Sequence, residues 1–87
     1  MSYYLFSAVK RCQPCRVLVD LLDHRIPDWK EKITYVDVDS AGLDHRKLAV
    51  KLGIMRIPAF GNDEELLPSP MGYMDIYKQI KEICTKG

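Results

Sequence analysis

Two cysteines separated by two residues are the part of the sequence that most directly predicts chemistry. They form the segment Cys12-Gln13-Pro14-Cys15, whereas the third cysteine, Cys84, lies alone near the end of the chain. Such a pair can alternate between two thiols and a disulfide, or it can supply two ligands to a metal ion. In a reducing compartment a pair with this spacing is more often catalytic or metal-binding than structural.

The residues around the pair favour a thiolate at Cys12. Apolar residues recur at helical spacing from Cys15 onward and follow a strand-like segment, so the pair lies where a strand passes into a helix. The free N–H groups and the positive dipole end of a helix N-terminus stabilise a thiolate. Lys10 and Arg11 add positive charge, and no acidic residue lies within six positions of Cys12. We therefore expect Cys12 to attack a substrate disulfide and the more covered Cys15 to resolve the mixed disulfide.

Two other readings of the pair compete with this one. A structural zinc site needs four ligands, usually from two such pairs. The remaining soft ligands are single residues without paired spacing, namely Cys84, His24 and His45. The pair could also be buried and without function, but its place before a helix argues against that. The sequence thus favours a redox role and predicts no metal, with Cys84 as a bystander on the last helix.

The spacing of apolar residues and turn formers predicts seven elements. We expect a strand over 3–9, a helix over 15–25, a strand over 33–38, and a helix that Ser40 caps and Gly53 ends. Two short strands within 54–67 form a hairpin, and an amphipathic helix follows the break at Pro68-Ser69-Pro70. The order β-α-β-α-β-β-α predicts an α/β fold. Its first two strands are parallel, and its four-stranded mixed sheet is flanked by three helices.

Length and composition limit the class of protein. The chain has 87 residues, enough for a single domain over 1–87, and it is 47% hydrophobic and 29% charged. Its 13 basic and 12 acidic side chains give a net charge of +1, which argues against a nucleic-acid-binding module. No apolar run approaches the ~20 residues of a membrane span, and the basic residues follow the first apolar stretch, unlike in a signal peptide. We expect a cytoplasmic monomer with neither nucleic acid nor membrane as a partner.

A second candidate feature is the Ile57-Pro58 pair before the predicted hairpin. A proline there is ordinarily a trans turn residue or an edge device. If the bond is cis, the backbone turns so that the N–H and C=O of Ile57 point outward. They would then offer a strand-like edge to a substrate peptide. The sequence alone leaves both alternatives open.

These residues together resemble a known family. The strand–CxxC–helix junction, Ile57-Pro58 before a hairpin, and Gly72 and Asp75 at the start of the last helix resemble the thioredoxin-fold thiol–disulfide oxidoreductases. The short length resembles the glutaredoxins in particular, and the resemblance covers essentially the whole chain. It implies a thioredoxin fold, a cis bond before Pro58 close to Cys12, and dithiol exchange.

The resemblance also implies a glutathione site. The Thr-Val-Pro segment of glutaredoxins corresponds to Arg56-Ile57-Pro58, and their Gly-Gly segment to Met71-Gly72. Met71 replaces the first glycine, and Pro14 replaces the tyrosine of the CPYC motif. The site that the resemblance implies, for substrate and glutathione, consists of Lys10, Arg11, Gln13, Pro14, Ile57, Pro58, Gly72 and Asp75.

The implied activity is reduction of protein or low-molecular-weight disulfides, with glutathione as co-substrate and no bound cofactor. One alternative is a thioredoxin-like electron donor that a flavoprotein reductase recharges. Another is a non-catalytic module, or one that carries an iron–sulfur cluster between two chains. The monothiol CGFS pattern associated with the cluster carriers is absent from the sequence.

Overall fold

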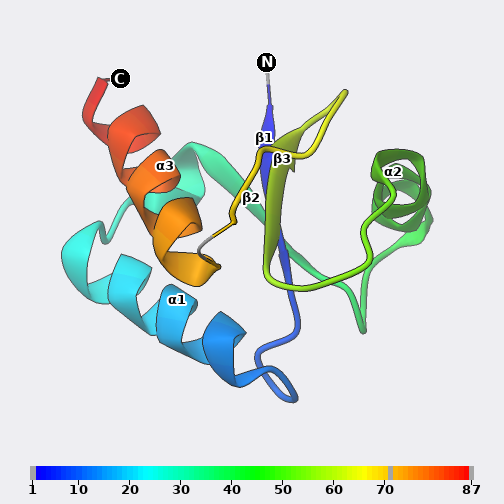
Figure 1. The fold of residues 1–87 in the computed structure, drawn as a ribbon, viewed down its shortest axis with the longest axis horizontal. Coiled ribbons are helices and arrows are strands. Elements are labelled where there is room, and N and C mark those ends of the chain that lie inside the picture. Colours follow the sequence, from blue (N-terminus) through cyan, green and yellow to red (C-terminus); the bar gives the residue numbers. More distant parts are fainter. Residues whose placement is uncertain (1, 71, 87) are drawn as a thin grey trace.

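The structure, a computed structural model, describes residues 2–70 and 72–86. Three strands, three α-helices and one short 3-10 helix follow one another in these residues (Figure 1). In chain order they are β1 (Tyr3–Ser7), α1 (Gln13–Arg25), η1 (Trp29–Glu31), β2 (Ile33–Asp37), α2 (Leu43–Leu52), β3 (Ala59–Asn62) and α3 (Tyr73–Lys86).

Strand β1 is the centre of the sheet, which has the order β2-β1-β3. It runs parallel to β2, with Tyr3 opposite Ile33, and antiparallel to β3, with Phe6 opposite Ala59. Aromatic and β-branched residues dominate these strands and pack well on a pleated surface. The sheet is therefore mixed, as predicted, and the carboxyl end of β1 leads directly into the segment that carries the two cysteines.

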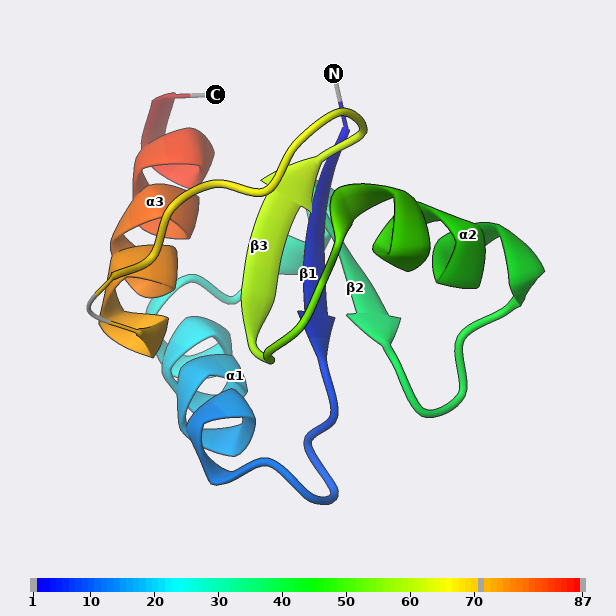
Figure 2. The same cartoon turned by 45° about the vertical axis from the view of Figure 1, so that its right-hand side comes forward.

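The helices cover both faces of the sheet. Leu5 packs with Leu18 of α1 and Ile76 of α3, whereas its neighbour Phe6 packs with Val36 and with residues of α2 on the other face. Figures 1 and 2 show α1 and α3 on one side of the strands and α2 on the other. Successive residues of a strand point to opposite faces, so one central strand serves both layers.

The predicted fourth strand is wrong for the residues that the structure describes. The segment after β3 returns beside it, but only as one antiparallel bridge between Gly61 and Leu66. The N–H of Leu67 donates to the carbonyl of Phe60 at 2.8 Å, and then Pro68 follows. Because a proline has no N–H to donate, the pairing ends there before a strand is established.

The helix limits differ from the predicted ones by a few residues. Helix α1 begins at Gln13, two residues early, and Gly42 rather than Ser40 is the N-cap of α2. Gly53 ends α2 in the left-handed region, with φ of 68°, as its position predicted. The 3-10 turn that buries Trp29 was not predicted. No helix within residues 2–70 and 72–86 combines the length and the apolar character needed to cross a membrane.

We predict that Gly61→Ala destabilises the fold by about 2 kcal/mol, because a Cβ there meets backbone and not a movable side chain. The added atom would lie 2.5 Å from the carbonyl oxygen of Glu65 and 2.9 Å from the Cα of Leu66. Urea unfolding followed by circular dichroism measures the loss.

Gly42→Ala is the matched control, since a Cβ at Gly42 meets nothing within 4 Å. Its cost at the N-cap should stay below about 1 kcal/mol. Equal stability of the Gly61 variant and the unsubstituted protein would contradict the close packing of Glu65 and Leu66 against Gly61.

Candidate active site

The loop between β1 and α1 places Cys12 at the N-terminus of the helix. The carbonyl of Ala8 accepts hydrogen bonds from the N–H groups of Arg11 and Cys12, at 3.1 and 2.9 Å. This turn leaves Cys12 in an extended conformation as the N-cap of α1. Pro14 lies in the first turn of α1, where a missing N–H costs no helical hydrogen bond. The sequence therefore folds locally so that a sulfur replaces the usual capping oxygen.

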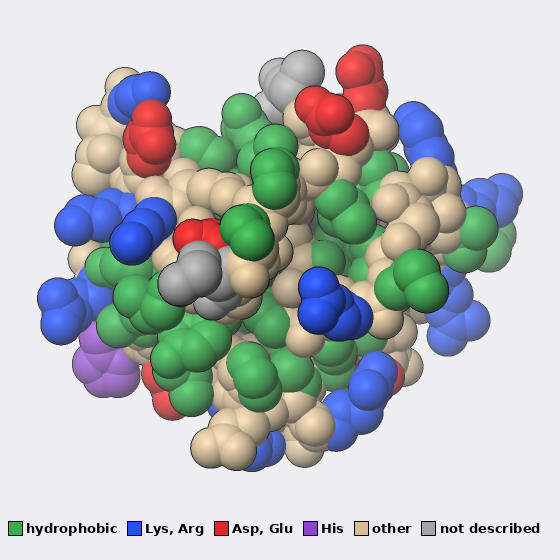
Figure 3. Space-filling view, viewed as in Figure 1, with side chains coloured by type: hydrophobic (Ala, Val, Ile, Leu, Met, Phe, Trp, Pro, Cys, Tyr) green, Lys and Arg blue, Asp and Glu red, His purple; other side chains and the backbone are tan. Residues whose placement is uncertain are grey.

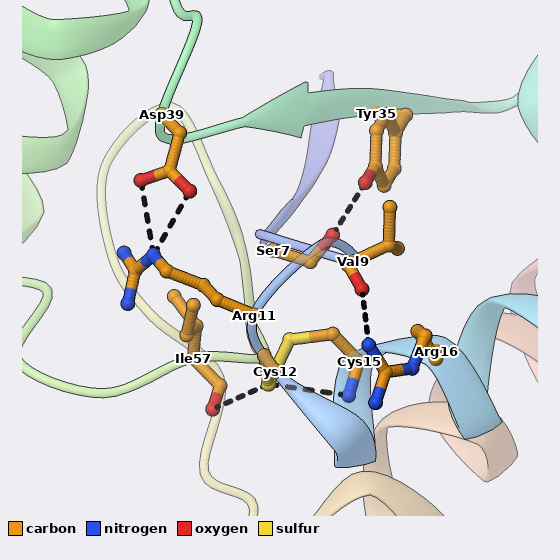
Figure 4. The surroundings of a disulfide bond; sticks show 9 residues. All are labelled: Ser7, Val9, Arg11, Cys12, Cys15, Arg16, Tyr35, Asp39 and Ile57. Carbon is orange, nitrogen blue, oxygen red and sulfur yellow. Dashed lines mark hydrogen bonds and ion pairs between the residues drawn. A yellow bond between two sulfur atoms is a disulfide. The ribbon is translucent and has the colours of Figure 1, made fainter.

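The sulfur of Cys12 receives a hydrogen bond from the helix that it caps. The N–H of Cys15 donates to Cys12 Sγ at 3.3 Å, and no acidic residue lies in the first turn of α1 (Figure 4). The N-terminal end of a helix carries a partial positive charge. The predicted position of Cys12 at the start of a helix is confirmed, and both features would favour negative charge on this sulfur in the reduced protein, where a stabilised thiolate remains a prediction.

The two cysteines form a disulfide and differ in exposure. Cys12 and Cys15 are bonded through their sulfurs, with Cα atoms 5.2 Å apart. Cys12 is half-buried, whereas Cys15 is completely buried against the core. An incoming disulfide can reach the first sulfur but not the second. The geometry thus separates an accessible sulfur from a covered one within a single helical turn.

The Ile57-Pro58 peptide bond is cis and lies beside the cysteine pair. The carbonyl oxygen of Ile57 is 3.7 Å from Cys12 Sγ, a distance at which the reduced thiol can donate to it (Figure 4). The pairing of β3 with β1 begins only at Ala59. Ile57 therefore lies outside the sheet ladder and next to the sulfur of Cys12.

Two grooves meet at the segment Met55–Ile57, and both include Arg56. The α2 groove has a volume of about 520 Å³, and its lining includes Arg11, Val38, Val50 and Ile54. The α3 groove has a volume of about 530 Å³, and its lining includes Pro14, Pro58, Ser69, Pro70, Gly72 and Tyr73. Both volumes fall within the ~300–1,000 Å³ typical of ligand sites. The cysteine pair is thus bordered by two surface depressions. We call the segment Met55–Ile57, which lines both of them, the ridge between the grooves.

An ion pair that sequence reasoning missed adjoins the site. The Nε of Arg11 donates to both carboxylate oxygens of Asp39, at 3.1 and 2.9 Å (Figure 4). This hydrogen bond and the positive charge of Arg11 hold the pKa of Asp39 below its usual value. Asp39 follows β2 and was not among the predicted site residues. Twenty-eight positions separate the partners, and only the parallel β1–β2 pairing, which indicates that the ends of these strands lie together, could have signalled the contact.

The other predicted site residues divide into two groups. Pro14, Pro58 and Gly72 are brought together in the α3 groove. Lys10 lies on a different surface with Arg16 and Val19, and Gln13 is exposed at the start of α1.

The start of α3 matches its prediction where the structure describes it. Asp75 lies in the first turn, and its N–H donates to the carbonyl of Gly72 at 3.2 Å. Gly72 has a φ of 83°, a conformation that favours glycine. Met71 lies outside the described residues.

The third cysteine, Cys84, takes no part in the disulfide. Cys84 is a free, half-buried thiol against the core of α1 and α3, and its burial raises its pKa. A raised pKa leaves less thiolate at neutral pH and makes this sulfur a poorer nucleophile. No group of three or more His, Cys, Asp or Glu side chains in the described chain is arranged to hold a metal ion.

Comparison with known proteins assigns no family to the chain. No family model matches the sequence, and no curated protein is significantly similar to it. The geometry of the cysteine pair, the cis proline and the two grooves therefore carries the functional argument.

We predict that Asp39→Asn increases the alkylation rate of Cys12 in the reduced protein. The substitution removes a carboxylate near the thiolate and releases Arg11, so the thiolate gains stability. An exposed charge interaction of about 0.5 kcal/mol corresponds to a roughly twofold change in rate. Iodoacetamide labelling at pH 7 in a Cys84→Ser background, followed by mass spectrometry, measures it.

Glu64→Gln is the control, because Glu64 follows β3 at the end of the sheet opposite to Cys12. Asn62 at that end of β3 pairs with Tyr3 at the beginning of β1. The control should react at the unsubstituted rate. An unchanged rate for Asp39→Asn would show that the ion pair does not influence Cys12, and a slower rate would contradict the predicted stabilisation of the thiolate.

Proposed function

We propose that this protein is a small dithiol thiol–disulfide oxidoreductase of glutaredoxin-like type. The observation that carries the proposal is the Cys12–Cys15 disulfide across the first turn of α1, with one sulfur accessible and the other buried. The sequence resemblance and the cis proline beside Cys12 support it. The corresponding fold is a short thioredoxin-like arrangement in which residues 65–67 provide a single bridge in place of the fourth strand.

The proposed reaction transfers two electrons from the protein dithiol to a substrate disulfide. The Cys12 thiolate attacks one substrate sulfur, the substrate S–S bond breaks, and the departing thiolate takes up a proton. Cys15 then loses its proton, and its thiolate attacks the Cys12 sulfur. The second substrate thiol leaves, and the Cys12–Cys15 disulfide remains. The substrate disulfide is reduced to two thiols while the protein dithiol is oxidised.

Each part of the site has a role in these reaction steps. The N–H of Cys15 and the N-terminus of α1 stabilise the attacking thiolate. The burial of Cys15 keeps it from reacting with solvent oxidants before a mixed disulfide forms next to it. The backbone of Ile57, outside the ladder of β3, provides an edge along which a substrate chain can lie.

The substrates in this proposal are protein or low-molecular-weight disulfides in the cytoplasm. Reduced glutathione is the proposed source of electrons, and the α3 groove beside Pro14, Pro58 and Gly72 is its proposed binding place. The alternative electron source is a flavoprotein reductase, which would reduce the Cys12–Cys15 disulfide directly. Neither source requires a bound metal or organic group.

We predict that Cys12→Ser abolishes disulfide reduction, whereas Cys84→Ser retains it. The first substitution removes the attacking sulfur, and the second removes a half-buried thiol outside the proposed reaction. The assay follows NADPH consumption with bis(2-hydroxyethyl) disulfide as substrate. One set of reactions contains glutathione and glutathione reductase, and the other contains thioredoxin reductase.

Turnover in the glutathione set alone supports glutathione as co-substrate, and turnover in the other set alone supports the reductase. Activity that persists at the unsubstituted level in Cys12→Ser would contradict the proposal. So would an absence of turnover by the unsubstituted protein in both sets.

A further inference from the structure

Among the described residues, the lining of the two grooves beside the cysteine pair is basic and apolar, and no Asp or Glu side chain belongs to it. Arg11 and Arg56 are the charged residues of the α2 groove, and Arg56 is the charged residue of the α3 groove, among the described residues. Arg11 is already engaged by Asp39. Arg56 is exposed and takes part in neither of the ion pairs found in residues 2–70 and 72–86. One uncompensated positive charge therefore lies on the ridge between the grooves.

Exposed apolar side chains adjoin this charge. Met55 is 93% exposed and Val50 is 82% exposed, and both line the α2 groove. Helix α2 has no fully buried residue, so it presents apolar side chains to solvent as well as to the sheet. Figure 3 shows hydrophobic and basic side chains intermingled over the half of the molecule that carries α2. Exposed apolar surface rimmed by charge is typical of an interaction site.

The ridge is next to the reactive sulfur. Arg56 precedes Ile57, whose carbonyl oxygen lies 3.7 Å from Cys12 Sγ. Ile57 lines both grooves, and Arg11, the neighbour of Cys12 in the chain, lines the α2 groove. A chain whose disulfide reaches Cys12 from the side of Ile57 therefore crosses this ridge or lies beside it.

We propose that the protein selects disulfides carried by acidic chain segments that also contain an apolar side chain. The acidic side chain pairs with Arg56, and the apolar side chain packs against Val50 and Met55 in the α2 groove. The inference rests on the proposed function, for which it names the substrate class. A phosphodiester ligand would satisfy the arginine but leave the apolar lining uncovered, so a peptide is the occupant that matches both features.

The test uses two synthetic peptides of equal length, each with one cysteine capped by 2-thioethanol through a disulfide. Both carry a leucine near the cysteine, and they differ only in two flanking residues, which are glutamates in one and lysines in the other. The cap is uncharged, so the charge difference lies in the peptide alone. The protein is reduced, freed of reductant and mixed with each peptide, and acid-quenched samples give the rate of peptide thiol release.

The expected result is a preference for the acidic peptide that depends on Arg56. The acidic peptide should react about fivefold faster at low salt, and Arg56→Gln should reduce this ratio about two- to threefold, the range of an exposed charge pair. The preference should weaken in 0.5 M salt because exposed charges are screened. Taking the ratio of two rates for each variant removes any effect of Arg56 on the thiolate itself.

Lys47→Gln is the matched control, because Lys47 is exposed on α2 and lines neither groove. It should keep the ratio of the unsubstituted protein. Equal rates for the two peptides, or a ratio that Arg56→Gln leaves unchanged, would overturn the substrate class. In either case a normal reaction with bis(2-hydroxyethyl) disulfide would show that the proposed function itself still holds.

The proposed packing of an apolar substrate side chain in the α2 groove can be tested separately. Val50→Ser should reduce the rate with the leucine-bearing acidic peptide about two- to threefold and leave a serine-bearing acidic peptide unaffected, since partial burial of a few methyl groups is lost. Equal effects on both peptides would overturn packing in the α2 groove. If the unsubstituted protein reduced neither the peptides nor bis(2-hydroxyethyl) disulfide, the proposed function would fail together with the inference.

Discussion

The structure of the site depends on the hydrogen bond from the N–H of Cys15 to the sulfur of Cys12. This contact of 3.3 Å makes Cys12 the cap of α1 and directs the helix N-terminus at the sulfur. It requires the turn at Ala8 that ends β1, and β1 in turn is fixed by two neighbouring strands and two core layers. The same helical turn buries Cys15. A single local geometry thus accounts for both the proposed attacking thiol and its proposed resolving partner.

The charges near Cys12 are distributed unevenly, and this unevenness gives the surface its character. Arg11 shares its charge with Asp39, whereas Arg56 has no ion-pair partner in the described part of the chain. In the account proposed here, the first arginine moderates the thiolate and the second contributes to the choice of substrate. Both are exposed, so each effect is small, salt-dependent and measurable as a ratio of rates. Met55 and Val50 add an apolar component, which unlike the two charges is not screened by salt.

The sequence predicted the features that depend on local patterns. The alternation and helical spacing of apolar residues located three strands and three helices, and the position of Cys12 before a helix depends on residues within one turn of it. The Arg11–Asp39 pair was missed because it joins residues 28 positions apart, and propensities carry no information on such contacts. The fourth strand was overpredicted, because Leu66 and Leu67 have strand-like character but Pro68 stops the ladder after one bridge. The cis bond before Pro58 followed only from the family resemblance and is present in the structure.

Trapping of the mixed disulfide in a Cys15→Ser variant tests the central claim most directly. Without the resolving thiol, attack by Cys12 should halt at a covalent adduct with the substrate thiol. Incubation with a disulfide-capped peptide and intact-mass analysis should show one peptide per chain, and fragmentation should place it on Cys12. Release of the peptide by dithiothreitol would establish the disulfide linkage. An adduct on Cys84 alone, or no adduct under conditions in which the unsubstituted protein reduces the peptide, would contradict the assignment of Cys12 as the attacking sulfur and Cys15 as the resolving one.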